Sequence, residues 1–123
     1  MTPKVAAIVI AQPVRFRESI QVLLSSISQI DEVLSFGNIT DALSLAANLT
    51  PSIVILDHQV ASIDLHSTLK LLCDAWQGAS RIVLVEDKDE FHQAMDHRTD
   101  LVLLKGFNAS KFIDVVEEIL KNR

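Results

Sequence analysis

Polar side chains that could do chemistry stand at the ends of four short apolar runs. In chain order they are Gln12 after residues 5–11, Asp57 after residues 53–56, Glu86 after residues 82–85 and Lys105 after residues 101–104. A carboxylate at the edge of an apolar core costs free energy unless it is paired or does chemistry. Lys105 is the natural partner of Asp57, which leaves two alternatives: a structural ion pair, or a phosphoacceptor carboxylate beside a phosphate-binding lysine. The spacing alone favours the ion pair, since structural ion-pair networks also perturb carboxylates.

The apolar runs predict the elements that must position these side chains. Each run is too short for a buried helix, and together they are typical of strands covered on both faces. A weaker fifth strand is expected at residues 33–36, before Gly37. Amphipathic helices are expected between the strands. The first covers residues 14–28, and the second is capped by Thr40 or Asn38, carries Leu49 and is stopped by Pro51. The third starts at Asp64 or Ser62 and is followed by Gly78, a short fourth is marked by Phe91, Ala94 and Met95, and the last is capped by Asn108.

This alternation of strands and helices predicts an α/β fold. Helical crossovers between consecutive strands imply a parallel sheet. The expected architecture is a three-layer, doubly wound, five-stranded parallel sheet in a single domain that spans residues 1–123. In such sheets ligands gather outside the carboxyl ends of the strands. We therefore expect the four polar residues to meet at that edge.

Composition and motifs exclude several functions. Eleven Lys and Arg residues against sixteen Asp and Glu residues give a net charge of −5, which argues against direct nucleic-acid binding. Cys73 is alone, which suits a reducing cytosol. No apolar run approaches the roughly 20 residues of a membrane span, so no membrane association is expected. The four histidines lack metal-ligand spacing, and no GxSxG, GxGxxG or GxxxxGK motif occurs.

Three stretches of the sequence resemble the receiver domain of bacterial two-component response regulators. They are VRFRESIQVLL at residues 14–24, PSIVILD at residues 51–57 and LVLLKGFNASKFIDVVEEIL at residues 101–120. The resemblance covers residues 4–120 and implies the flavodoxin-like (βα)5 fold. It also implies that Asp57 occupies the phosphoacceptor position and that Lys105 occupies the position of the lysine that contacts the phosphoryl group.

The chain departs from the receiver pattern where a metal would bind. Receivers have an acidic pair after the first strand that holds Mg²⁺, and here Ala11 and Gln12 stand at those positions. Mg²⁺ prefers carboxylate, water and phosphate oxygens. Asp57 alone makes a poor site, so we expect no cofactor and no metal.

The switch positions of the pattern are also degenerate. Val85 stands where receivers carry a Ser or Thr, and Val102 stands where they carry an aromatic residue. The proline after the third-strand loop is replaced by Ala61, and the proline after the lysine is replaced by Gly106. A cis peptide bond after Lys105 is therefore not expected.

Glu86 is large where the family has a small residue. It could form a salt bridge with Lys105, or restore a carboxylate near the missing metal site as a compensating acid. The alternative is a solvated loop acid within the run Glu86, Asp87, Asp89 and Glu90, and the sequence favours this alternative.

These features predict a degenerate receiver, or pseudo-receiver, in the cytoplasm. It would not be an enzyme, and it would act in a two-component or phosphorelay pathway by binding a sensor kinase, an output domain or a regulator. It could also form a homodimer through the face of the fourth helix, fifth strand and fifth helix. The main alternative is a working receiver that is phosphorylated on Asp57 with Mg²⁺. Such a receiver could form the N-terminal part of a transcriptional response regulator. A flavodoxin-like ligand binder or enzyme is a third, on fold grounds alone.

Overall fold

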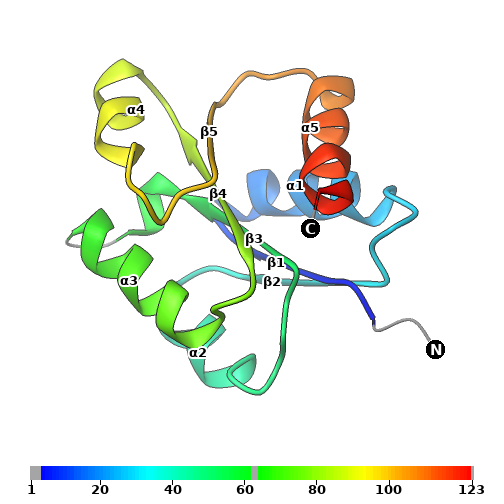
Figure 1. Cartoon of the computed structure of the whole chain (residues 1–123). Coiled ribbons are helices and arrows are strands. Elements are labelled where there is room, and N and C mark those ends of the chain that lie inside the picture. Colours follow the sequence, from blue (N-terminus) through cyan, green and yellow to red (C-terminus); the bar gives the residue numbers. More distant parts are fainter. Residues whose placement is uncertain (1–3, 62–63, 123) are drawn as a thin grey trace.

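Strands and helices alternate along the part of the chain that the computed structural model describes, residues 4–61 and 64–122 (Figure 1). The strands are β1 (Ala6–Ile10), β2 (Glu32–Phe36), β3 (Ile53–Asp57), β4 (Ser80–Val85) and β5 (Leu101–Leu104). The helices are α1 (Val14–Ser25), α2 (Ile39–Leu45), α3 (Leu65–Ala75), α4 (Lys88–Ala94) and α5 (Ala109–Lys121), with a short 3-10 helix η1 (His58–Val60) directly after β3. Each predicted strand and helix is confirmed.

The five strands form one parallel sheet in the order β2-β1-β3-β4-β5. Helices α1 and α5 cover one face of this sheet, and α2, α3 and α4 cover the other (Figure 1). The order reverses direction between β1 and β3, which is the doubly wound arrangement. The predicted three-layer fold is therefore confirmed.

Alternate residues of the central strands face opposite sides of the sheet. Because helices cover both sides, all five residues of β1 are buried. Ala7 and Val9 belong to the core shared with α1 and α5, where Phe112 is fully buried. Ile8 and Ile10 belong to the core shared with α2 and α3. Because burying one large apolar side chain stabilises a fold by about 1.5–3 kcal/mol, both cores hold the strand ends in place.

Asparagine and aspartate side chains cap four of the helices. Asn38 accepts a hydrogen bond from the backbone N–H of Asp41, and Asn108 accepts one from Lys111. Asp64 caps α3, and Asp87 caps α4. Asn38 rather than Thr40 is the cap of α2. The other candidate for the start of α3, Ser62, lies outside the described residues.

Two helices are shorter than the sequence predicted. Helix α1 ends at Ser25, and α2 ends at Leu45 rather than continuing through Leu49. The N–H of Leu49 instead donates to the carbonyl of Ala46 in a turn. Pro51 disfavours a helical conformation at Thr50, so it limits how far the helix could run, and the turn from Ala46 to Leu49 ends it earlier.

None of the helices in residues 4–61 and 64–122 is long and apolar enough to span a bilayer.

Candidate functional site

The predicted polar residues meet at the carboxyl edge of the sheet. Asp57 is the last residue of β3, Glu86 follows β4 and Lys105 follows β5. The N–H of Lys105 donates to the carbonyl of Val85 at 2.7 Å, which aligns the ends of β4 and β5. Parallel pairing of the strands thus brings together Asp57 and Lys105, which lie 48 positions apart in the sequence.

Asp57 is fully buried, and three donors surround its carboxylate. Oδ1 accepts from the ammonium Nζ of Lys105 at 2.8 Å and from the backbone N–H of Gln59 at 3.1 Å. Oδ2 accepts from the backbone N–H of Gln12 at 3.4 Å. An ionised carboxylate only accepts hydrogen bonds, so this arrangement suits the charged form. The predicted ion pair between Asp57 and Lys105 is confirmed.

The ammonium of Lys105 is shared between two carboxylates. Besides Asp57, it contacts Oε1 of Glu86 at 3.2 Å, and it lies 4.8 Å from the centre of the Phe16 ring in α1. The Lys105 side chain is 15% exposed. The cation therefore bridges a buried acid and a surface acid, and the ring of Phe16 adds a cation–π contact.

Glu86 forms contacts at the site that the favoured sequence interpretation did not include. Its side chain is 49% exposed, as a loop acid would be, but Oε1 also accepts from Lys105 and from Nε2 of Gln59 at 3.3 Å. The interpretation of Glu86 as merely solvated is therefore wrong. The salt bridge forms because the ends of β4 and β5 are neighbours and Lys105 is long enough to reach both acids.

Gln12 donates its backbone N–H to Asp57, and its side chain points away from Asp57 toward Gly37. Nε2 of Gln12 donates to the carbonyl of Gly37 at 3.0 Å, at the end of β2. A Cβ on Gly37 would lie 2.4 Å from Nε2 of Gln12, so a larger residue there would displace the end of the Gln12 side chain from this position. Ala11 is fully buried in the core. The peptide bond between Gln12 and Pro13 is cis.

The two valines that the resemblance places at the switch positions belong to the core. Val85 is fully buried, Val102 is nearly so, and both lie on the side of α2, α3 and α4. Ala61 packs against the same core. Gly106, directly after Lys105, has a φ of 97°, a conformation that L side chains rarely adopt.

Two residues near Asp57 were missed at the sequence level. Gln59 supplies both a backbone donor to Asp57 and a side-chain donor to Glu86. Its position two residues after an aspartate is the signal for the first contact, because aspartate commonly accepts from the N–H two residues on. Phe16 lies in the amphipathic helix predicted over residues 14–28, and nothing in its spacing pointed to Lys105.

The donor set fits Mg²⁺ poorly. Within residues 4–61 and 64–122, no group of three or more His, Cys, Asp or Glu side chains could hold a metal ion. Ala11 offers no side-chain oxygen, and the amide of Gln12 is engaged with Gly37. Glu86 is the acid that contacts the same ammonium as Asp57, and Lys105 takes the place between them that a cation would need.

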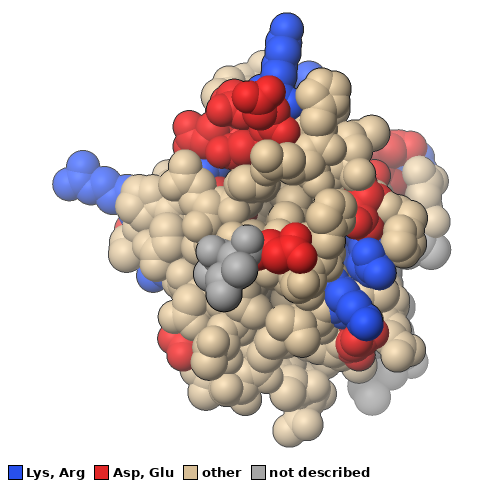
Figure 2. Space-filling view, turned by 90° about the vertical axis from the view of Figure 1, so that its left-hand side faces the viewer, with Lys and Arg blue, Asp and Glu red and all other residues tan. Residues whose placement is uncertain are grey.

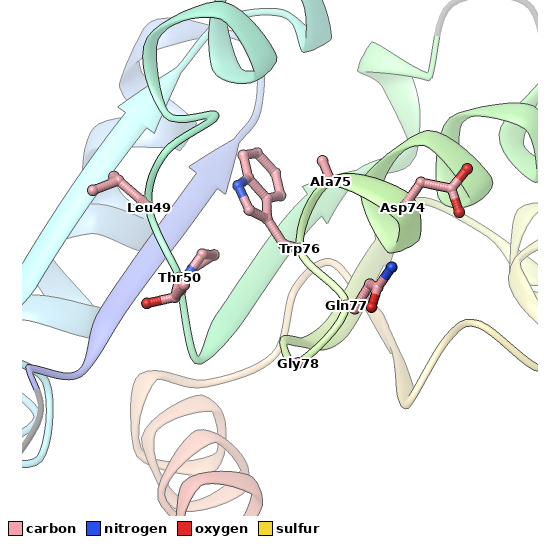
Figure 3. Close-up of a pocket in the computed structure, with 8 residues that line it drawn as sticks. Leu49, Thr50, Asp74, Ala75, Trp76, Gln77 and Gly78 are labelled. Atoms are coloured by element: carbon pink, nitrogen blue, oxygen red, sulfur yellow. The ribbon is translucent and has the colours of Figure 1, made fainter.

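A separate pocket of about 350 Å³ lies at the other edge of the sheet (Figure 3). Its lining comes from the segments that precede β3 and β4, including Leu49, Pro51, Trp76 and Gly78. The indole N–H of Trp76 donates to the carbonyl of Ala46 at 3.0 Å, so the ring is fixed by the fold. This pocket is remote from Asp57, since the two lie at opposite ends of the parallel strands.

Comparison with solved structures gives the fold class. No family model matches the sequence, and no curated protein is significantly similar to it. The receiver domain of AraT, a response regulator from Geobacillus stearothermophilus, is 19% identical with a TM-score of 0.79, over 95% of this chain and 93% of that one. A response regulator from Thermotoga maritima is 15% identical with a TM-score of 0.80, over 97% of this chain and 99% of that one.

A third similar structure holds a metal. The receiver domain of a sensor histidine kinase from Pseudomonas aeruginosa, solved with a magnesium ion in its active-site cleft, is 12% identical with a TM-score of 0.79. The match covers 97% of this chain and 99% of that domain. The chain therefore has the flavodoxin-like (βα)5 fold of response regulator receiver domains, as the resemblance implied.

Proposed function

We propose that this chain is a receiver-like signalling module that acts by protein–protein contact without Mg²⁺-dependent phosphorylation. It would work in a cytosolic two-component or phosphorelay pathway, as a binding partner of a sensor kinase, an output domain or a regulator. It would not be an enzyme. The fold supports the class of module, and the residues around Asp57 support the absence of phosphorylation.

The observation that carries the proposal is the closed set of contacts on Asp57. Both carboxylate oxygens accept hydrogen bonds, and the counter-charge is the ammonium of Lys105. Phosphoryl transfer to a carboxylate from a small donor needs a divalent cation to neutralise the phosphoryl oxygens and align the donor. Ala11 and Gln12 supply no formal charge for such a cation.

One observation favours the alternative of a working receiver. Oε1 of Glu86 contacts the same ammonium as Oδ1 of Asp57, so a second carboxylate stands near the phosphoacceptor position. If Lys105 moved aside, Glu86 could replace one member of the missing acidic pair. In that case Glu86 would be a metal ligand and Asp57 would accept the phosphoryl group.

Intact-mass spectrometry after incubation with acetyl phosphate and Mg²⁺ separates the two functions. We expect no phosphoryl mass on the wild-type chain, because the cation has no acidic pair to bind. A triple variant, Ala11→Asp with Gln12→Asp and Val85→Thr, supplies the metal ligands and the switch hydroxyl and serves as the positive control. A mass gain on the wild type that disappears in Asp57→Asn would overturn the proposal. Loss of that gain in Glu86→Gln would then identify the substitute ligand.

A further inference from the structure

Strand β2 lies at one edge of the sheet, and in the described residues it pairs only with β1 (Figure 1). The N–H of Glu32 donates to the carbonyl of Val5 at 3.3 Å, and the carbonyl of Phe36 accepts from the residue after β1 at 3.1 Å. Both ends of β2 thus turn backbone groups toward β1. Because these groups alternate in direction along a strand, the N–H and C=O of Val33 and Ser35 point away from the sheet.

The residues of β2 do not block the addition of another strand along this outer side. Natural edge strands are commonly protected by lysine, by proline or by a bulge. The sequence of β2 is EVLSF, which has no charged residue after Glu32 and no proline, and its register with β1 is unbroken. Val33, Leu34 and Phe36 are partly exposed. The outer side of β2 therefore combines outward backbone groups with apolar side chains.

The two ends of this edge carry opposite charges. At the amino end Asp31 is exposed and Glu32 is partly exposed. Oδ2 of Asp31 accepts from the N–H of Val5 at 2.8 Å, and a carboxylate can accept further hydrogen bonds. At the carboxyl end Nη1 of Arg17 lies beside Gly37, because a Cβ built on this glycine would be 2.6 Å from it. The edge is therefore acidic where β2 begins and basic where β2 ends.

The guanidinium of Arg17 can accommodate a carboxylate at this end. Arg17 belongs to α1, and its side chain is partly exposed. It forms no side-chain hydrogen bond, ion pair or ring contact with another described residue. A guanidinium presents five N–H donors in a planar fork that matches a carboxylate. An acid brought to the carboxyl end of β2 would therefore meet a suitable cation.

We propose that two copies of this chain pair through β2, with the strands antiparallel and a two-fold axis at Leu34. In that register Val33 of one copy stands opposite Ser35 of the other, and both residues have outward backbone groups. Opposed residues of this kind exchange N–H···O bonds in both directions. The symmetry repeats the exchange at the second Ser35 and Val33 pair, so the two sheets join into one continuous sheet.

The same register matches the charges of the edge. With Leu34 opposite its own counterpart, Asp31 of one copy stands opposite Gly37 of the other and therefore beside its Arg17. A shift of one residue would place outward backbone groups opposite inward ones, so the alternation restricts the register. The edge is thus complementary to itself, which is why the occupant is a second copy of this chain. The pairing does not rest on the proposed function.

Such an interface is small, so the association should be weak. Two short strands bury less surface than stable dimers do, and we expect a dissociation constant on the order of 0.1–1 mM. Strand β5 is the other edge of the sheet and could carry contacts of its own. The test therefore needs a measurement at single residues of β2.

Amide hydrogen exchange measured by NMR on the whole chain provides that measurement. Samples at about 2 mM and about 0.05 mM lie on either side of the expected dissociation constant. We expect the protection of Val33 and Ser35 to be roughly threefold higher in the concentrated sample, because the paired state is populated there. The amide of Leu34 faces β1 in either state, so its protection should be nearly constant and serves as the internal reference.

Ser35→Pro tests the backbone hydrogen bonds. Proline is tolerated where the N–H of an edge strand faces solvent, so the variant removes one outward donor and keeps the pairing with β1. The dissociation constant, measured from the concentration dependence at Val33, should rise at least about tenfold. Ser35→Ala is the matched control, because it removes the hydroxyl that donates to Gln21 but keeps the N–H, and it should change the constant by less than about twofold.

Arg17→Glu tests the charges and keeps the test decisive if Ser35→Pro unfolds. It places an acid beside Asp31 of the other copy and should raise the dissociation constant roughly fivefold or more. Arg15→Glu, at an exposed arginine two residues earlier in α1, is the matched control and should change the constant by less than about twofold.

The pairing through β2 is wrong if Val33 and Ser35 are equally protected at both concentrations, whether or not the chain associates through another surface. It is also wrong if Ser35→Pro weakens the association no more than Ser35→Ala does. Equal effects of Arg17→Glu and Arg15→Glu would contradict the contact between Arg17 and Asp31. These measurements do not involve Asp57, so the pairing and the proposed function can fail independently.

Discussion

A buried carboxylate has to be compensated, and at Asp57 the compensation comes from one cation and two backbone donors. Removing one partner of a buried pair leaves an uncompensated charge, which costs more than the pair contributes. Lys105 is also the link to Glu86, so the ammonium holds two acids that would otherwise repel each other. The stability of this edge of the sheet therefore depends on Lys105 more than on either acid.

Lys105→Met should destabilise the chain by about 2–4 kcal/mol, because Asp57 is left charged and buried with only its two backbone donors. Asp57→Asn should cost less, about 1–2 kcal/mol, since Lys105 keeps Glu86 as a partner. Urea unfolding followed by circular dichroism measures both values. Lys111→Met, at an exposed lysine of α5, is the matched control and should change stability by less than about 0.5 kcal/mol.

The reverse order would contradict this view of the site. If Asp57→Asn costs more than Lys105→Met, the hydrogen bonds to the backbone of Gln12 and Gln59 dominate and the ion pair is secondary. If Lys105→Met has no effect, the pair contributes nothing to stability.

The sequence predicted part of the site for a physical reason. Asp57 and Lys105 each follow an apolar run, and parallel strands bring their ends to one edge. The direction of the Gln12 side chain could not be predicted, because it depends on the open space at Gly37, twenty-five residues away. The hydrogen bonds of His58 with Gln93 and of His66 with Asp96 likewise join residues 35 and 30 positions apart, which spacing rules do not detect.

At the scale of elements, the central strands were predictable because burial on both faces leaves continuous apolar runs. The starts of α2 and α5 were predictable because Asn38 and Asn108 are good capping residues. The end of α2 was not, because Leu49 is apolar and fits the helical spacing, yet packs from a turn. The end of α2 thus depends on tertiary packing, whereas the starts of α2 and α5 depend on local side-chain hydrogen bonds.

The cap of α5 gives a prediction at this scale. Oδ1 of Asn108 accepts from the backbone N–H of Lys111 at 2.7 Å, so Asn108→Ala should cost about 1 kcal/mol of stability. Asn48 lies in the exposed turn after α2 and is the matched control, for which Asn48→Ala should be nearly neutral. Chemical denaturation of both variants measures the difference. If the two variants lose the same amount of stability, the cap hydrogen bond of Asn108 contributes nothing to the free energy of unfolding.

At the scale of the whole molecule, charge is unevenly distributed. Figure 2 shows acidic side chains gathered at the top of the molecule, the level at which α4 begins in Figure 1. The first turn of α4 contains Asp89 and Glu90, after the capping Asp87. Helix α5 carries side chains of both signs, the two lysines Lys111 and Lys121 and the three acids Asp114, Glu117 and Glu118. Acidic side chains thus lie on the α4 side of β5, an edge strand of the sheet, and side chains of both signs lie on the α5 side.

The same face has an apolar centre. A pocket of about 360 Å³ is lined by residues of α4, β5, α5 and the loop between β5 and α5, including Phe91, Leu104, Phe107 and Lys111. Leu104 is 44% exposed, and Met95 at the end of α4 is 62% exposed. An apolar centre with charged side chains around it suits an interface between two copies, and a two-fold axis placed through β5 would bring the α4 of each copy near the α5 of the other.

We therefore expect two copies of this chain to associate weakly through α4, β5 and α5. Association should weaken as salt increases, because the contacts between Lys111, Lys121 and the acidic turn of α4 are exposed to solvent. The double variant Lys111→Glu with Lys121→Glu should raise the dissociation constant by about tenfold or more in sedimentation velocity at low salt. Lys4→Glu, ahead of β1 at the amino ends of the strands, is a control for charge reversal away from this face and should leave the dissociation constant unchanged. A wild type that stays monomeric at every concentration and salt level, or a double variant that associates as well as the wild type, would show that this face does not join two copies.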